Sequence, residues 1–149
     1  MFRCIHISTM QKLLAIMYYV RSVPFVVGFF AVVYLSFISG ETVNTTFSPD
    51  IRAMEHPLHT MMYACLTASA ILAFGKTTFD FQLGINCGIC MTILGAIIEI
   101  LQATIPGVNR SCTMSDQLSN TLGSVIGIFL FFGFLFAFKK AQQYTLHKI

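Results

Sequence analysis

The stretch from residue 99 to residue 127, EILQATIPGVNRSCTMSDQLSNTLGSVIG, predicts how the rest of the chain is arranged. A carboxylate and an amide, Glu99 and Gln102, end one apolar run, and Pro106 and Gly107 then break it. Three further polar residues, Arg110, Asp116 and Asn120, lead into a second apolar run. An ionisable residue at the centre of a membrane helix costs about 2.5 to 3.5 kcal/mol on insertion scales, so it rarely lies there without a partner. The stretch therefore predicts a polar site inside a membrane bundle.

The composition of the whole chain is that of a membrane protein. Of its 149 residues, 56% are hydrophobic and only 10% are charged, and the mean hydropathy is +0.75. A soluble domain usually carries about 25% charged residues. The net charge of +3 is small and scattered, with no basic stripe, so no nucleic-acid partner is expected. The sequence predicts one domain over residues 1–149, with the lipid bilayer as its surroundings.

Four apolar segments are long enough to cross a bilayer, since roughly 20 apolar residues span about 30 Å of hydrocarbon. The predicted spans are residues 23–39, 57–75, 83–105 and 117–138. Ser115 or Asp116 is the expected N-cap of the last one. Small residues at helical spacing mark faces where neighbouring helices can approach closely. These are Gly84, Gly88 and Gly95 in the third span and Gly123 and Gly127 in the fourth. The expected fold class is all-α, a bundle of four transmembrane helices.

The basic residues predict the orientation of this bundle. With four spans, the two termini and the turn near residue 76 share one side. That side holds seven of the nine Lys and Arg residues: Arg3, Lys12, Arg21, Lys76, Lys139, Lys140 and Lys148. Only Arg52 and Arg110 lie on the other side. By the positive-inside rule, both termini are expected in the cytoplasm.

Three spans are expected to bring polar side chains to one depth. These side chains are His59 and Tyr63 in the second span, Glu99 and Gln102 in the third, and Asp116 and Asn120 in the fourth. At 1.5 Å per residue, all of them fall within about 10 Å of the outer boundary of the bilayer. The sequence therefore predicts one hydrogen-bonded cluster near the outer leaflet, with Arg110 closing over it from the third loop.

Several interpretations of this cluster remain open. Polar residues can simply hold a membrane bundle together, since interhelical hydrogen bonds contribute on the order of 0.6 to 2 kcal/mol each. The second interpretation is a binding site for a ligand or lipid head group, because this part of the chain carries more charge than bundle packing requires. The charged or ionisable residues are Glu99, Asp116, His59 and Arg110. In a catalytic version, His59 or Glu99 would act as a general base while Arg110 held a phosphate or carboxylate.

Catalysis and metal binding have weaker support than a binding site. No nucleophile with a local signature lies near the cluster, so the sequence leans towards a protein that is not an enzyme. His59, Glu99 and Asp116, together with His56, are acceptable metal ligands, but no tight spacing motif supports them. We therefore predict no metal and no cofactor.

The pair formed by Cys87 and Cys90, CGIC, lies mid-span, away from the solvent-facing helix N-termini that activate thiolates. It is interpreted as packing.

The order of these motifs resembles the VanZ-like family of small bacterial membrane proteins. The matching residues are Glu55, His56, His59 and Tyr63, then Glu99 and Gln102, then Arg110, and finally Asp116, Asn120 and Gly123. The resemblance covers roughly residues 21–136. Glu55 and His56 replace the usual Asp and Lys, so a role that needs the charge of that lysine is not carried over. The resemblance implies a four-span membrane protein, and some members lower susceptibility to teicoplanin, but it implies no settled activity or catalytic residue.

The expected function is recognition of an anionic or polar head group, of a cell-envelope lipid or a glycopeptide, in the outer leaflet. Arg110 would contact the anion, while His59, Glu99 and Asp116 would hold the ligand. An accessory subunit of a larger membrane complex and a membrane enzyme acting on a lipid-linked substrate are the alternatives. The expected location is the bacterial inner membrane, or an organellar membrane in a eukaryotic source.

Overall fold

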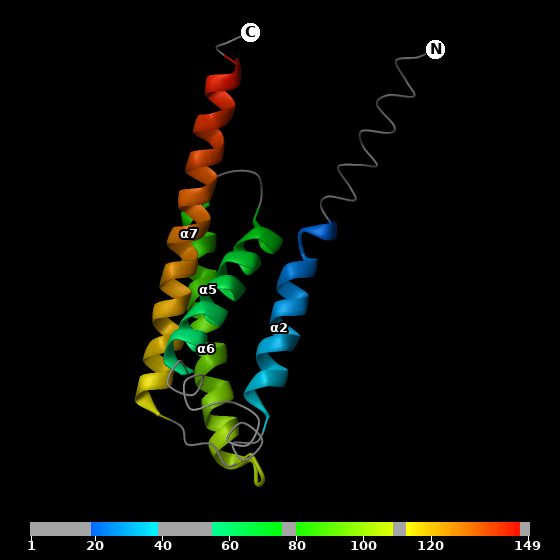
Figure 1. Ribbon diagram of the computed structural model, residues 1–149, viewed down its shortest axis with the longest axis vertical. Helices are drawn as coiled ribbons and strands as arrows, with labels where there is room; N and C mark the ends of the chain where they lie inside the picture. The colour runs from blue at the N-terminus through cyan, green and yellow to red at the C-terminus, as the bar shows by residue number, and fades with distance from the viewer. Residues whose placement is uncertain (1–18, 39–54, 76–79, 109–112, 147–149) are drawn as a thin grey trace, which may run out of the picture.

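The computed structural model describes residues 19–38, 55–75, 80–108 and 113–146. This part of the chain forms four α-helices and no strand, which confirms the all-α prediction. The helices are α2 (Val23–Ser36), α5 (Glu55–Phe74), α6 (Phe81–Thr104) and α7 (Met114–Leu146). They run alternately up and down, so the end of α2, the start of α5, the end of α6 and the start of α7 lie at one end of the bundle (Figure 1).

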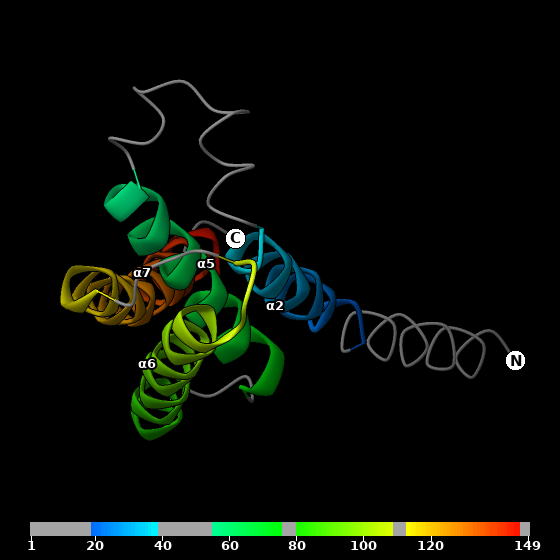
Figure 2. The same ribbon diagram turned by 90° about the horizontal axis from the view of Figure 1, so that it is seen from below.

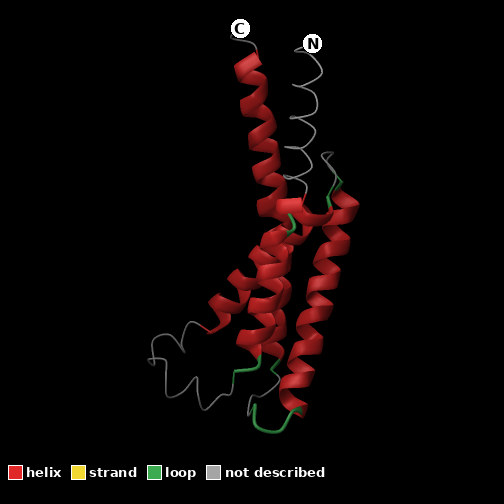
Figure 3. Ribbon diagram, turned by 90° about the vertical axis from the view of Figure 1, so that its right-hand side faces the viewer, coloured by secondary structure: helices red, strands yellow, loops and turns green. Residues whose placement is uncertain are grey.

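Three of these helices are long and apolar enough to cross a membrane. The qualifying segments are His56–Phe74, Phe81–Thr104 and Met114–Ala137. Their composition indicates a bilayer environment, as predicted. The fourth helix, α2, has only 14 residues and measures about 21 Å. By contrast, α7 has 33 residues, measures about 50 Å and extends beyond the other described helices (Figure 3).

The helix α5 lies between α2 and the pair formed by α6 and α7 (Figure 2). The buried apolar side chains form two clusters along it. One contains Val32, Tyr63, Leu66, Met91 and Ile98, and the other contains Ala70, Ile71 and Cys87. Large apolar side chains also cover much of the outer surface, including Phe129, Phe134 and Phe136 on α7. Such a surface is expected of helices that face lipid.

Glycines on α7 allow its backbone to touch that of α5. A Cβ at Gly123 would collide with the carbonyl oxygen of Thr60 and lie 2.9 Å from the Cβ of Tyr63. A Cβ at Gly127 would lie 2.5 Å from the carbonyl oxygen of Ala64. The glycines of α6 face α7 as well: Gly84 faces Phe132, Gly88 faces Ile128 and Gly95 faces Asn120. The α5–α7 contact is therefore a close backbone approach of the small-xxx-small kind.

Side-chain caps move two helix starts away from the predicted boundaries. The prediction of Ser115 or Asp116 as the N-cap of the last helix is wrong. Instead Thr113 precedes the helix, and its Oγ1 accepts a hydrogen bond from the backbone N–H of Asp116 at 3.2 Å. Similarly, Asp80 accepts from the N–H of Leu83 at 3.0 Å, so α6 begins at Phe81, two residues before the predicted span. Satisfying the free N–H groups of a first turn in this way fixes where a helix starts.

Candidate functional site

The centre of the candidate site is a contact between α5 and α7. His59 Nδ1 lies 3.0 Å from Asn120 Oδ1. Asn120 is only 1% exposed, while His59 is half-buried. The amide fits because α6 presents a glycine to it: a Cβ on Gly95 would lie 3.0 Å from Asn120 Nδ2. Since Asn120 offers a carbonyl oxygen, His59 donates from Nδ1.

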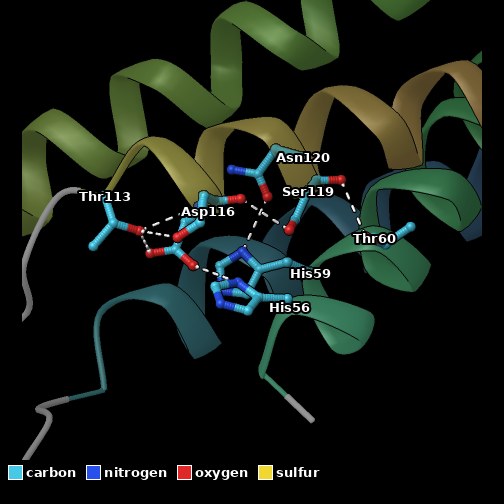
Figure 4. Close-up of polar contacts among 8 residues, drawn as sticks. His56, His59, Thr60, Thr113, Asp116, Ser119 and Asn120 are labelled. Carbon is cyan, nitrogen blue, oxygen red and sulfur yellow. Dashed lines mark hydrogen bonds and ion pairs between the residues drawn. The ribbon is translucent and has the colours of Figure 1, made fainter. Parts of the chain in front are cut away.

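A second pair lies one turn further towards the end of the bundle. His56 Nδ1 is 3.2 Å from Asp116 Oδ1, and Thr113 Oγ1 donates to Asp116 Oδ2 (Figure 4). The two histidines are three residues apart on α5, and their two partners are four apart on α7, so each pair of positions shares a helix face. The side chains of α5 and α7 therefore form two contacts, His59–Asn120 and His56–Asp116, one helical turn apart across the interface.

The most buried part of the cluster lies further from the end of the bundle than these two contacts. Glu99 is 2% exposed and Tyr63 is 1% exposed. Glu99 on α6 interacts electrostatically with Tyr63, which follows His59 by one turn of α5. A carboxylate at this depth is costly unless it is partnered.

The amide of Gln102 connects the cluster to α2. Its Nε2 donates to the carbonyl oxygen of Ser36 at 2.6 Å, and both residues are buried. Ser36 is the last residue of α2, and the last carbonyls of a helix have no partner within the helix itself. Gln102 therefore satisfies the end of α2 and fixes it beside α6.

The structure brings the described members of the predicted cluster to one end of the bundle. The sequence predicted one hydrogen-bonded cluster from three spans and did not say which side chains pair across them. The observed contacts join His59 to Asn120 and His56 to Asp116. The predicted anion contact, Arg110, lies outside the described residues.

Exposure falls steadily from the rim of the bundle to its interior. The side chain of His56 is 55% exposed, and that of Asp116 is 13% exposed. Asn120 and Glu99, further in, are closed off almost completely. Among the residues that the structure describes, neither histidine Nε2 has a hydrogen-bond partner. The two imidazole rings at the rim therefore each keep one ring nitrogen with which to hydrogen-bond a ligand.

The described residues contain no group of three His, Cys, Asp or Glu side chains that could hold a metal ion. The cluster is chemically a hydrogen-bonding site: imidazole rings at the rim and carboxylates and amides behind them. Such a site can orient a polar group that reaches the end of the bundle.

Sequence reasoning missed three participants. Thr113 forms the T-x-x-D pattern with Asp116, which is close to the capping-box signature and could have been recognised. Thr60 Oγ1 donates to the carbonyl oxygen of Ser119 at 3.3 Å, next to the His59–Asn120 contact. The third participant is the backbone carbonyl of Ser36, which carries no signal in the sequence. Two of the three contacts involve a backbone carbonyl, and only the fold reveals those.

Comparisons with protein-family models, with curated proteins and with solved structures gave no match. The function is therefore inferred from the site itself.

Proposed function

We propose that this chain is a VanZ-like, four-span membrane protein with both termini in the cytoplasm, and that its polar cluster recognises a polar or anionic head group in the outer leaflet. In this proposal α2 supplies the remaining span. The membrane is the bacterial inner membrane, and a role in teicoplanin susceptibility follows from the resemblance. The motif order from Glu55 to Gly123 supports the family, and the basic residues near Lys139 support the orientation.

The observation that carries the proposal is the pair of histidines at the rim. Both rings are held through Nδ1 by α7, by Asp116 for His56 and by Asn120 for His59. A ring fixed through one nitrogen presents the other in a set direction. Two such rings on one helix face form a preorganised polar contact surface for a group that lies at the membrane boundary.

Bundle packing alone does not require this arrangement at the rim. An ion pair whose histidine is 55% exposed contributes only about 0 to 1 kcal/mol to stability. The part-buried contact of Asn120 with His59 and the buried contact of Gln102 with Ser36 already join α7 to α5 and α6 to α2. The outer pair of His56 and Asp116 is therefore better explained by orienting a ring than by stabilising the fold.

The direct test measures which lipids the protein retains. The full chain is reconstituted in nanodiscs containing equal amounts of phosphatidylglycerol and phosphatidylcholine, released into mild detergent and analysed by native mass spectrometry. Selective retention of phosphatidylglycerol is expected, and the double variant His56→Ala/His59→Ala should lose the selectivity. Gly133→Ala is the matched control, because a Cβ there meets nothing within 4 Å. Equal retention of both lipids by the unmodified chain would contradict recognition of an anionic head group.

A cellular test addresses the family role. Glu99→Gln and Arg110→Ala are expected to abolish any change in teicoplanin susceptibility that the unmodified chain confers on a host, with Gly133→Ala again as the control. If both variants are present in the membrane at normal level and the phenotype is unchanged, the cluster is not the site of that role.

A further inference from the structure

An open groove of about 240 Å³ runs between α2 and α5. On the α2 side it is lined by Gly28, Ala31 and Leu35, and on the α5 side by Met62, Cys65 and Ser69. The only hydroxyl among these residues is already satisfied, because Ser69 Oγ donates to the carbonyl oxygen of Leu66 at 2.9 Å. The groove therefore offers an apolar surface with no unmet hydrogen-bonding group of its own.

The groove exists because two helices with small residues face each other without closing. Across the α5–α7 contact, a Cβ on Gly127 would lie 2.5 Å from the backbone of Ala64. On α2, a Cβ on Gly28 would reach only the Cδ1 of Leu66, at 3.5 Å, which is an ordinary van der Waals distance. Small residues normally let membrane helices come together. Here they leave an open apolar groove between α2 and α5.

The groove ends beside the polar cluster. Leu35 directly precedes Ser36, which accepts from Gln102, and Met62 follows His59 by three residues, so the two are neighbours on the surface of α5. From Met62 to Ser69 the groove follows α5 for about 10 Å. It therefore extends from the depth of the cluster towards the middle of the hydrocarbon layer.

From this continuity we infer that the ligand is a glycerophospholipid, with one acyl chain in the α2–α5 groove and its head group at His56 and His59. The head-group half of this inference rests on the proposed function. The acyl-chain half rests on the groove, which is apolar and open and lies along α5, a helix of membrane length and composition, so that hydrocarbon rather than water covers it. A ligand with a chain anchored in the bilayer is a lipid and not a water-soluble glycopeptide.

The test uses a phosphatidylglycerol that carries a photoreactive diazirine midway along one acyl chain. The full chain is reconstituted in phosphatidylcholine vesicles that contain this lipid, illuminated and mapped by peptide mass spectrometry. Adducts are expected to concentrate on residues 28–35 and 62–69 rather than on the exposed apolar face of α7. The variant Gly28→Leu should lower the yield in the groove about tenfold, which corresponds to about 1.4 kcal/mol of lost contact. The same substitution at Gly133, where a Cβ meets nothing within 4 Å, should leave the yield unchanged.

A second variant guards against a folding defect in Gly28→Leu. Ala31 lines the groove and is exposed, so Ala31→Phe fills the space from outside without disturbing a packed residue. If adducts are spread over all lipid-facing residues, or if neither variant lowers the yield in the groove, the acyl-chain site is overturned. A bifunctional maleimide that joins Cys65 of two copies in high yield would show a second chain in the groove and would also overturn it.

The outcomes separate this inference from the proposed function. In one outcome, His56→Ala/His59→Ala abolishes the head-group selectivity while the groove adducts persist. This outcome supports both the acyl-chain site and the proposed head-group recognition. Groove adducts without any head-group selectivity in the unmodified chain support the acyl-chain site and contradict the proposed head-group recognition. Selectivity without groove adducts contradicts the acyl-chain site alone.

Discussion

At the scale of single residues, Asn120 has the most constrained position in the cluster. It is 1% exposed, lies against Gly95 and meets His59 at 3.0 Å. We expect a double-mutant cycle with His59→Ala and Asn120→Ala to give a coupling energy of about 0.6 to 1.7 kcal/mol, the range of interhelical hydrogen bonds within membranes. The measurement is reversible unfolding in mixed detergent on titration with sodium dodecyl sulfate.

The neighbouring Ser119 supplies the control for that cycle. Its hydroxyl donates to the carbonyl oxygen of Ser115 within the same exposed turn, at 2.9 Å. Ser119→Ala removes this local bond but keeps the backbone carbonyl that Thr60 uses. Ser119→Ala combined with His59→Ala should therefore be additive. A coupling as large as that of Asn120 would mean that the cycle reports a general loosening of α5 and α7 and not a specific bond.

The start of α7 gives a second prediction for single residues. Thr113→Ala removes the acceptor for the N–H of Asp116 and the donor to its carboxylate. Loss of an N-cap costs about 0.5 to 2 kcal/mol. Ser115→Ala, at a position that the sequence suggested as the cap, should cost clearly less in the same detergent unfolding assay. The reverse order would show that the helix begins at the later residue.

At the scale of helices, the contact of α5 with α7 depends on the absence of a side chain at Gly123. A methyl group there meets the Thr60 carbonyl and the Cβ of Tyr63, and the backbone cannot move aside as a flexible side chain could. We expect Gly123→Ala to destabilise the bundle by about 1 to 3 kcal/mol, as overpacking does elsewhere. Gly133→Ala on the same helix should be neutral, since nothing lies near it. Equal midpoints in the detergent unfolding assay would contradict a close backbone contact.

The helices were also the part of the fold that the sequence predicted best. Apolar length alone placed α6 within two residues of its observed start, and the motif spacing placed the polar side chains at one end. Hydropathy could not locate the caps, because a cap depends on one hydroxyl or carboxylate and not on an average. Nor could it select the pairs: spacing along one helix relates Asp116 to Asn120, while their partners on α5 depend on how α5 and α7 meet.

At the scale of the whole molecule, the alternating course of the helices sets which ends can share a membrane face. The described helices place the His56–Asp116 pair at one end of the bundle and the extension of α7, with exposed Lys139 and Lys140, at the other (Figure 1). The cluster is thus separated from the basic residues by the apolar length of α7. This separation allows the polar rim and the basic end to face different compartments, which a site for outer-leaflet lipid requires.

The last prediction tests this orientation with two single cysteines in a chain whose five native cysteines are replaced by alanine. Ser115 and Gln143 are both exposed and lie near opposite ends of α7, 28 residues or about 42 Å apart along the helix axis. Ser115→Cys should react with a membrane-impermeant maleimide in intact spheroplasts, and Gln143→Cys only after permeabilisation, because Lys139, Lys140 and Lys148 favour the cytoplasmic side. Labelling of both from outside would mean that α7 does not cross the bilayer. Inverted labelling would place the histidine rim in the cytoplasmic leaflet, where the same contacts could bind only an inner-leaflet lipid.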